Sequence, residues 1–230
     1  MRRGGGGKVV RVVLSLIGLL VVLLALAQLL LPRIAASRIS SRIGRYGHVT
    51  SVNVSAWPAV KLLWKDADNV TVRASDISVD PSQTDRLLAE ARGTAKLDLR
   101  AERAREGPLA VTDVYVEKRG RELRASAFAS AADVRAALPP GFDVQLLSSE
   151  GGKVEVRASG GLFGIGASVD AVAEAREGKL VVHPRGALIE ALRLTLFDEP
   201  DVELQSIAAH AATGADGEAG YELEASATLR

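Results

Sequence analysis

Residues that could carry out covalent chemistry are few and scattered in this 230-residue chain. The chain has no cysteine, which excludes a thiol nucleophile. Its three histidines, His48, His183 and His210, lie far apart, and none has a partner at metal-ligand spacing. No nucleophile elbow, phosphate-binding loop or zinc-protease motif occurs. We therefore expect no enzymatic activity, no metal and no cofactor.

A glycine-rich segment at residues 160–166 comes closest to a nucleotide-binding motif. Val169 stands where the third glycine of that motif would be, and the segment precedes a predicted strand instead of a helix. We interpret it as a hairpin with large apolar residues, of which Phe163 and Ile165 are candidate lipid contacts.

Two other segments hold more large apolar residues than ordinary strands do, namely WPAVKLLW at 57–64 and ALIEALRLTLF at 187–197. Both could be ordinary core. The alternative is that they line an apolar cavity or touch a membrane, where Trp is favoured at the interface. On that alternative the further lipid-binding candidates are Trp57, Val60, Leu62, Leu63, Trp64, Leu188, Ile189 and Leu192.

An apolar stretch over residues 12–31 indicates where the chain acts. Its twenty residues carry no charge and would form a helix roughly 30 Å long, the thickness of a bilayer's hydrocarbon core. Four basic residues precede it, which keeps the N-terminus in the cytoplasm and places the rest across the membrane. Two alternatives remain: a retained single-pass anchor, or a signal peptide cleaved after Ala27, which would release a secreted or periplasmic domain.

The residues after Pro32 form a basic amphipathic pattern. At helical spacing, Arg38, Arg42 and Arg45 cluster on one side of an apolar stripe. Such a helix could pack on the domain with its arginines in solvent, or the arginines could contact anionic lipid headgroups.

Charge is distributed unevenly along the chain. Of 29 basic residues, eight lie in the first 45 positions, where none of the 28 acidic residues occurs. Residues 46–230 are therefore mildly acidic, which argues against nucleic acid as a partner. Because there is no cysteine, burial alone must stabilise an exported domain of this size.

From His48 onward, apolar residues alternate with a period of two, which predicts roughly nine or more strands. Trp57-Pro58 should end the first strand, and a capping box at Ser130 should begin a helix that runs to Leu138. A second short helix is expected over 81–92. Alternation of this kind is typical of antiparallel sheets. The predicted fold class is mainly β with few helices (α+β).

The order of these features resembles the LmeA-like phospholipid-binding family of actinobacterial and cyanobacterial envelope proteins. The features that carry the resemblance are the membrane segment, Trp57-Pro58 with Leu62-Leu63, NVTVRASDISVD, the capped helix in SAFASAADVRAAL and EGKLVVHP. The chain departs from the family at Trp64-Lys65, where a glycine is common. The resemblance covers about residues 33–230.

This resemblance implies a tubular lipid-binding (TULIP-like) fold, in which a long curved antiparallel sheet wraps a helix around an apolar cavity. The expected organisation is a basic cytoplasmic N-terminus (1–11), an anchor or signal segment (12–31) and an extracytoplasmic domain (33–230). The domain would sequester or transfer phospholipid or another acyl lipid without covalent catalysis, at the membrane and beside envelope-biosynthesis proteins. The alternative is a non-catalytic interaction domain with a solid core.

Overall fold

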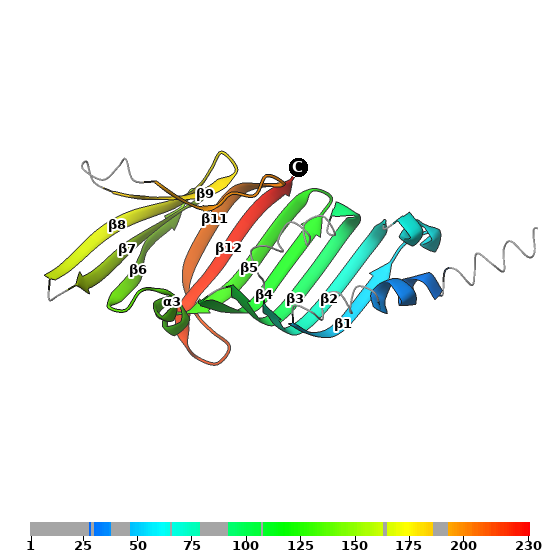
Figure 1. Ribbon diagram of the computed structural model, residues 1–230, viewed down its shortest axis with the longest axis horizontal. Coiled ribbons are helices and arrows are strands. Elements are labelled where there is room, and N and C mark those ends of the chain that lie inside the picture. The colour runs from blue at the N-terminus through cyan, green and yellow to red at the C-terminus, as the bar shows by residue number, and fades with distance from the viewer. Residues whose placement is uncertain are drawn as a thin grey trace, which may run out of the picture.

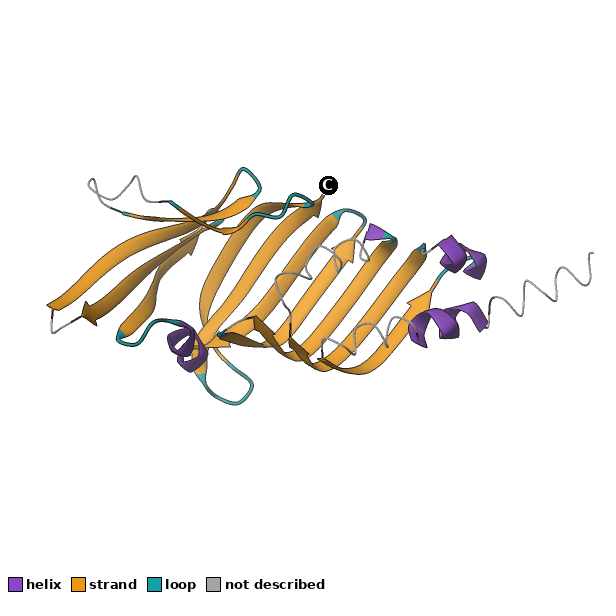
Figure 2. Ribbon diagram, viewed as in Figure 1, coloured by secondary structure: helices purple, strands orange, loops and turns teal. Residues whose placement is uncertain are grey.

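The chain folds into two open β-sheets with a few short helices (Figures 1 and 2). This computed structural model describes residues 28, 30–37, 47–64, 66–78, 92–106, 108–162, 165–185 and 193–230. The mainly β prediction is confirmed. Within those ranges no helix is long and apolar enough to cross a membrane. Most of the apolar stretch at 12–31 lies outside the described residues.

The larger sheet has seven strands, of which β1 and β11 form the two edges. In spatial order they are β1 (Gly47–Ser55), β2 (Ala67–Ser78), β3 (Thr94–Glu106), β4 (Leu109–Arg119), β5 (Glu122–Ser130), β12 (Ala219–Leu229) and β11 (Val202–Thr213). The C-terminal hairpin of β11 and β12 thus pairs directly with β5. A turn at residues 214–218, which contains two glycines, joins these two strands.

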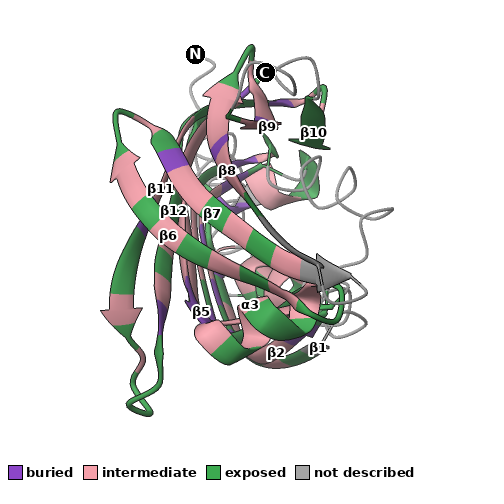
Figure 3. Cartoon of the chain, turned by 90° about the vertical axis from the view of Figure 1, so that its left-hand side faces the viewer, coloured by how far each residue is buried: buried purple, intermediate pink, exposed green. Residues whose placement is uncertain are grey.

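The smaller sheet has five antiparallel strands. In spatial order they are β10 (Leu194–Phe197), β9 (Lys179–Pro184), β8 (Ile165–Arg176), β7 (Lys153–Leu162) and β6 (Phe142–Glu150). The two sheets meet along β11, which contacts β6, β7, β8 and β9 (Figure 3). The Ala209 N–H donates to Ser149 Oγ at 2.9 Å, and Leu204 N–H donates to the Gly178 carbonyl at 2.9 Å.

Pairing between β2 and β3 is parallel, whereas the resemblance implied an all-antiparallel sheet. A parallel pair needs a crossover of a dozen or more residues. The segment between Ser78 and Thr94 is long enough for one, and the predicted helix at 81–92 falls there, outside the described residues except for Arg92. Period-two alternation is the same in both kinds of pair, so the sequence pattern could not reveal this difference.

The capped helix is confirmed as α3 (Ala131–Ala137). Ser130 Oγ accepts the Asp133 N–H at 3.0 Å, which is the bond that the capping box predicts. The helix ends at Leu138, as expected. Since α3 contacts β4, β5 and β12 of one sheet and β6 of the other, it packs at the junction of the two sheets.

The best-buried part of the core lies at the β1 end of the larger sheet. Val54, Val70 and Val72 are at most 4% exposed, and Ala35 and Ala36 of a helical segment at 30–37 pack against them. Trp57-Pro58 ends β1 as predicted, and a 3₁₀ helix, η1 (Ala59–Trp64), then leads into β2. The chain just after the apolar N-terminal stretch is therefore part of the folded domain.

One face of the smaller sheet carries cross-strand ion pairs. Arg157 makes two bonds to the carboxylate of Asp170, at 2.7 and 2.9 Å. Glu174, whose side chain is 12% exposed, lies 2.8 Å from Lys153, 3.6 Å from His183 and 3.8 Å from Arg176. The bond from Lys153 is the main reason that the pKa of Glu174 is lowered from its usual 4.5.

Candidate lipid-binding site

A continuous apolar face runs across five strands of the larger sheet. Strand register places Leu99 of β3 opposite Val116 of β4, Val116 opposite Ala125 of β5, and Ala125 opposite Ala225 of β12. Directly paired residues point to the same side of a sheet. We call this set the apolar face: Leu97, Leu99, Val114, Val116, Leu123, Ala125, Ala127, Leu223, Ala225, Ala227 and, from β11, Ile207.

Every side chain of the apolar face is only half-buried. The contrast is with β2, whose Val70 and Val72 on the same side of the sheet are 4% and 1% exposed. A solid core would bury the central strands at least as well as the strands near an edge. The described residues therefore cover the apolar face incompletely, and it offers a ligand an apolar surface of about 19 Å across four inter-strand spacings of about 4.8 Å.

The smaller sheet has a comparable apolar side. Leu146 of β6 pairs with Val156 of β7, which pairs with Ala171 of β8, and all three are half-buried. Figure 3 shows the resulting alternation along β6 and β7 as bands of half-buried and exposed residues. Tyr221, on the apolar side of β12, donates its hydroxyl to the Val144 carbonyl of β6 at 3.4 Å.

A single lysine interrupts the apolar face near one rim. Lys118 lies between Leu97 of β3 and Leu123 of β5, is 2% exposed, and donates its ammonium to the carbonyl oxygen of Thr94. Burial lowers the pKa of Lys118 from its usual 10.5, because an apolar surrounding disfavours the charged form. An ammonium has three N–H donors. Lys118 is thus a buried cation placed beside an apolar surface.

The opposite side of the same strands is polar and holds a shallow hollow of about 380 Å³. Its lining includes Tyr115, Glu117, Arg124, Ser126 and Glu224. Nothing in this lining pairs a nucleophile with a histidine base, and the described residues contain no cluster of three or more metal-ligating side chains.

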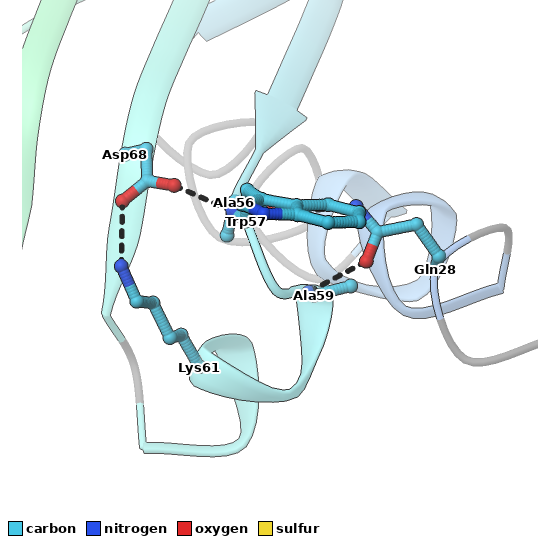
Figure 4. Close-up of polar contacts among 6 residues, drawn as sticks. All are labelled: Gln28, Ala56, Trp57, Ala59, Lys61 and Asp68. Atoms are coloured by element: carbon cyan, nitrogen blue, oxygen red, sulfur yellow. Dashed lines mark hydrogen bonds and ion pairs between the residues drawn. The ribbon is translucent and has the colours of Figure 1, made fainter. Parts of the chain in front are cut away.

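The segment 57–64 forms an exposed corner beside β1 and β2. Figure 4 shows its polar contacts. The backbone N–H of Trp57 donates to the carboxylate of Asp68, which lies 3.3 Å from the Lys61 ammonium. The backbone bond from Trp57 is the main cause that lowers the pKa of Asp68. Gln28 lies beside them, with its Nε2 donating to the Ala56 carbonyl at 3.2 Å and its Oε1 accepting the Ala59 N–H at 2.8 Å. Polar bonds therefore fix the backbone of this corner.

The structure places part of the predicted lipid-binding set. Leu62 packs against the buried cluster of β1 and β2, whereas Trp57, Leu63 and Trp64 are 72%, 64% and 73% exposed. Exposure on this scale does not fit the lining of a cavity. Since the two alternatives to ordinary core were a cavity lining and contact with a membrane, contact with a membrane remains for these three residues.

The other predicted residues are not placed as contacts. Val60 lies in η1 and Ile165 begins β8, but the side chains of both are outside the described set. Outside the described residues altogether are Phe163, Leu188, Ile189, Leu192, Arg38, Arg42 and Arg45. The segment 187–197 proved to contain an edge strand, β10, with Leu194 and Leu196 exposed.

Sequence reasoning missed the apolar face itself and Lys118. The period-two pattern showed which residues share a side of a strand, but it did not show how completely that side is covered. For Lys118 a signal was present, because its position continues the apolar alternation of Val114 and Val116. A charged residue in an apolar register is a candidate for a buried charge.

Comparison with known proteins found no relative of this chain. No protein-family model matches the chain, and neither the curated proteins nor the solved structures contain a match to it.

Proposed function

We propose that this chain is an extracytoplasmic lipid-binding protein of a bacterial envelope, which holds acyl lipids against the apolar face and sequesters or transfers them without covalent catalysis. The observation that supports it best is the half-buried apolar face across β3, β4, β5, β12 and β11. On this proposal the sheets and segments of the domain form a tubular lipid-binding fold, in which the acyl chains complete the core.

The energetics of lipid movement favour such a surface. Two acyl chains with about thirty methylenes would cost on the order of 24 kcal/mol to expose to water, at about 0.8 kcal/mol per methylene. Transfer from a bilayer to an apolar protein surface nearly cancels this term, since both surroundings are apolar. Discrimination between lipids then falls to the headgroup, and Lys118 supplies a cation at the rim of the face.

Mass spectrometry of lipid that copurifies with the full chain tests the proposal, together with uptake of a fluorescent phospholipid from vesicles. Ala125→Trp, in the middle of the apolar face, should reduce the lipid per protein several-fold by occupying the surface. Ser126→Trp is the matched control, because it places the same side chain one residue away on the polar side of β5.

Comparing the two variants shows whether lipid is lost because the apolar face is blocked or because any large side chain on β5 disturbs the protein. Equal lipid content in Ala125→Trp and the wild-type protein would overturn the assignment to the apolar face. A full chain that is free of lipid and takes up none would overturn lipid binding altogether and favour a domain with a solid core.

A further inference from the structure

Large apolar side chains that stay exposed are concentrated at one end of the described molecule. Leu30 and Ile34 of the helical segment at 30–37 are 52% and 49% exposed, and at η1 the values for Trp57, Leu63 and Trp64 reach 72%, 64% and 73%. We call these five residues the exposed apolar end. Single exposed apolar residues are normal on a protein surface, but a group of this size marks an interaction site.

The local backbone keeps these side chains exposed. A 3₁₀ helix repeats every three residues. Ala59, 1% exposed, and Leu62, packed on the core, therefore share the inner side of η1, while Leu63 and Trp64 fall on its outer sides. Both tryptophans of the chain lie here.

Gln28 joins the two parts of the exposed apolar end, which are the helical segment at 30–37 and the region of η1. Its amide uses both its donor and its acceptor on the backbone of residues 56 and 59, just before and at the start of η1 (Figure 4). Gln28 also belongs to the apolar stretch at 12–31. Only leucines follow it there, so it is the last residue of the stretch whose side chain can form hydrogen bonds. The last residues of that stretch are thus fixed against η1.

We propose that the exposed apolar end is a membrane-docking surface, seated in the glycerol and upper acyl region of a phospholipid leaflet where the chain emerges from the bilayer. Tryptophan prefers that region, because its ring is apolar and its N–H can still reach a polar partner. Lys61 is already paired with Asp68, so these two charges offset one another at the corner. This inference rests on the membrane location in the proposed function.

Docking in this way would orient the apolar face toward the lipid supply. Figure 1 shows η1 beside β1 at one end of the larger sheet, with the other strands extending away from it. Asp68 near the start of β2, and Thr94 at the start of the parallel β3, lie at the same end of the strands as η1, and Lys118 reaches Thr94. The rim that carries Lys118 thus lies on the side of the sheet nearest the docked surface.

Intrinsic fluorescence tests the inference directly, because both tryptophans belong to the surface. The full chain is reconstituted into phosphatidylcholine vesicles with and without phosphatidylcholine brominated near the top of its acyl chains. We expect bromine to quench the emission, the emission maximum to lie toward the blue, and acrylamide to quench several-fold less well than in the urea-unfolded chain. Trp57→Phe and Trp64→Phe then report each ring separately.

The control uses a second exposed apolar pair, Leu194 and Leu196 of β10, which are 61% and 58% exposed at the edge of the other sheet. Leu63→Ser should raise the access of acrylamide to Trp64, whereas Leu194→Ser should not. Emission that bromine leaves unquenched and acrylamide quenches fully would overturn docking even if lipid copurifies. Bromine quenching in a chain that binds no lipid on the apolar face would leave docking in place and overturn only the proposed function.

Discussion

Lys118 is the residue at which stability and the proposed activity oppose one another. Its ammonium is almost fully buried beside leucines, and the bond to the Thr94 carbonyl is its described partner. A buried charge with so few partners lowers the stability of a fold. An anionic headgroup beside it would supply the missing charge, so the arrangement suits a bound lipid better than an empty domain.

We expect Lys118→Met to unfold with a free energy equal to or higher than that of the wild-type protein at pH 7, by up to ~1 kcal/mol, because an apolar residue of similar volume replaces a buried charge. The lowered pKa means that the unfolded chain binds more protons between that pKa and 10.5, so wild-type stability should rise with pH across this window. The variant should lack that rise. Urea unfolding at pH 7 and pH 10 measures both effects.

Lys96→Met, at an exposed position of β3, serves as the control and should keep the rise. If Lys118→Met were instead less stable than the wild-type protein by ~2 kcal/mol, the ammonium would be a structural donor to Thr94. The same variant should retain less anionic lipid relative to zwitterionic lipid, which a purely structural lysine would not affect.

Glu174 should make stability depend on acid pH. Its pKa is lowered, chiefly by the bond from Lys153, so its contribution is fully present above 4.5 and is lost as pH falls through the lowered value. Glu174→Gln should therefore lower the melting temperature at pH 7, and the difference from wild type should shrink below pH 4. Thermal unfolding at both pH values measures this, with Glu150→Gln at an exposed position of β6 as control. A pH-independent difference would indicate that packing alone is responsible.

At the scale of elements, the joint between the 30–37 helix and η1 depends on Gln28. Gln28→Ala removes two partly buried hydrogen bonds, each worth about 1 kcal/mol. We expect the Ala59 amide to exchange with solvent roughly tenfold faster, while amides of β4 and β5 stay unchanged. Hydrogen exchange followed by mass spectrometry measures both regions. Equal exchange at Ala59 in the two proteins would show that the Ala35 and Ala36 contacts hold the joint without Gln28.

Local signals predicted the individual elements well. The capping box at Ser130 acts within four residues, and Trp57-Pro58 breaks β1 because proline cannot donate to a strand ladder. Non-local pairing was not predictable in this way. The parallel match of β2 with β3, and the division of the strands into two sheets, depend on which distant strands meet, and alternation carries no information on that.

The candidate site shows the same contrast between local features, which the sequence revealed, and features that depend on the whole fold. Trp57, Leu63 and Trp64 stood out in the sequence because of their size and density, and the structure adds that they are exposed. The apolar face consists of ordinary valines, leucines and alanines that resemble core residues in any sheet. Only the arrangement of the whole molecule leaves it half-buried, so a single sequence could not identify it.

For the molecule as a whole, bound lipid should act as part of the core. A ligand that binds only the folded state at one hundred times its Kd adds about 2.7 kcal/mol. For a domain of about 200 residues this corresponds to a rise in melting temperature of roughly 5–10 °C. Calorimetry of the delipidated chain, before and after phospholipid is added back, measures it. An unchanged melting temperature, with lipid shown to be bound, would indicate that lipid contacts only the surface.

The position of β12 between β5 and β11 has a consequence for how the chain matures. Residues 131–218, including the entire smaller sheet, separate β5 from its partner in sequence. A chain that crosses a membrane from its N-terminus onward would therefore display the unpaired edge of β5 until β12 emerges. An unpaired strand edge can pair with another chain, which promotes aggregation. Because contacts between distant segments form slowly, translocation and folding of this protein would overlap little, and the eleven residues of β12 would complete the larger sheet.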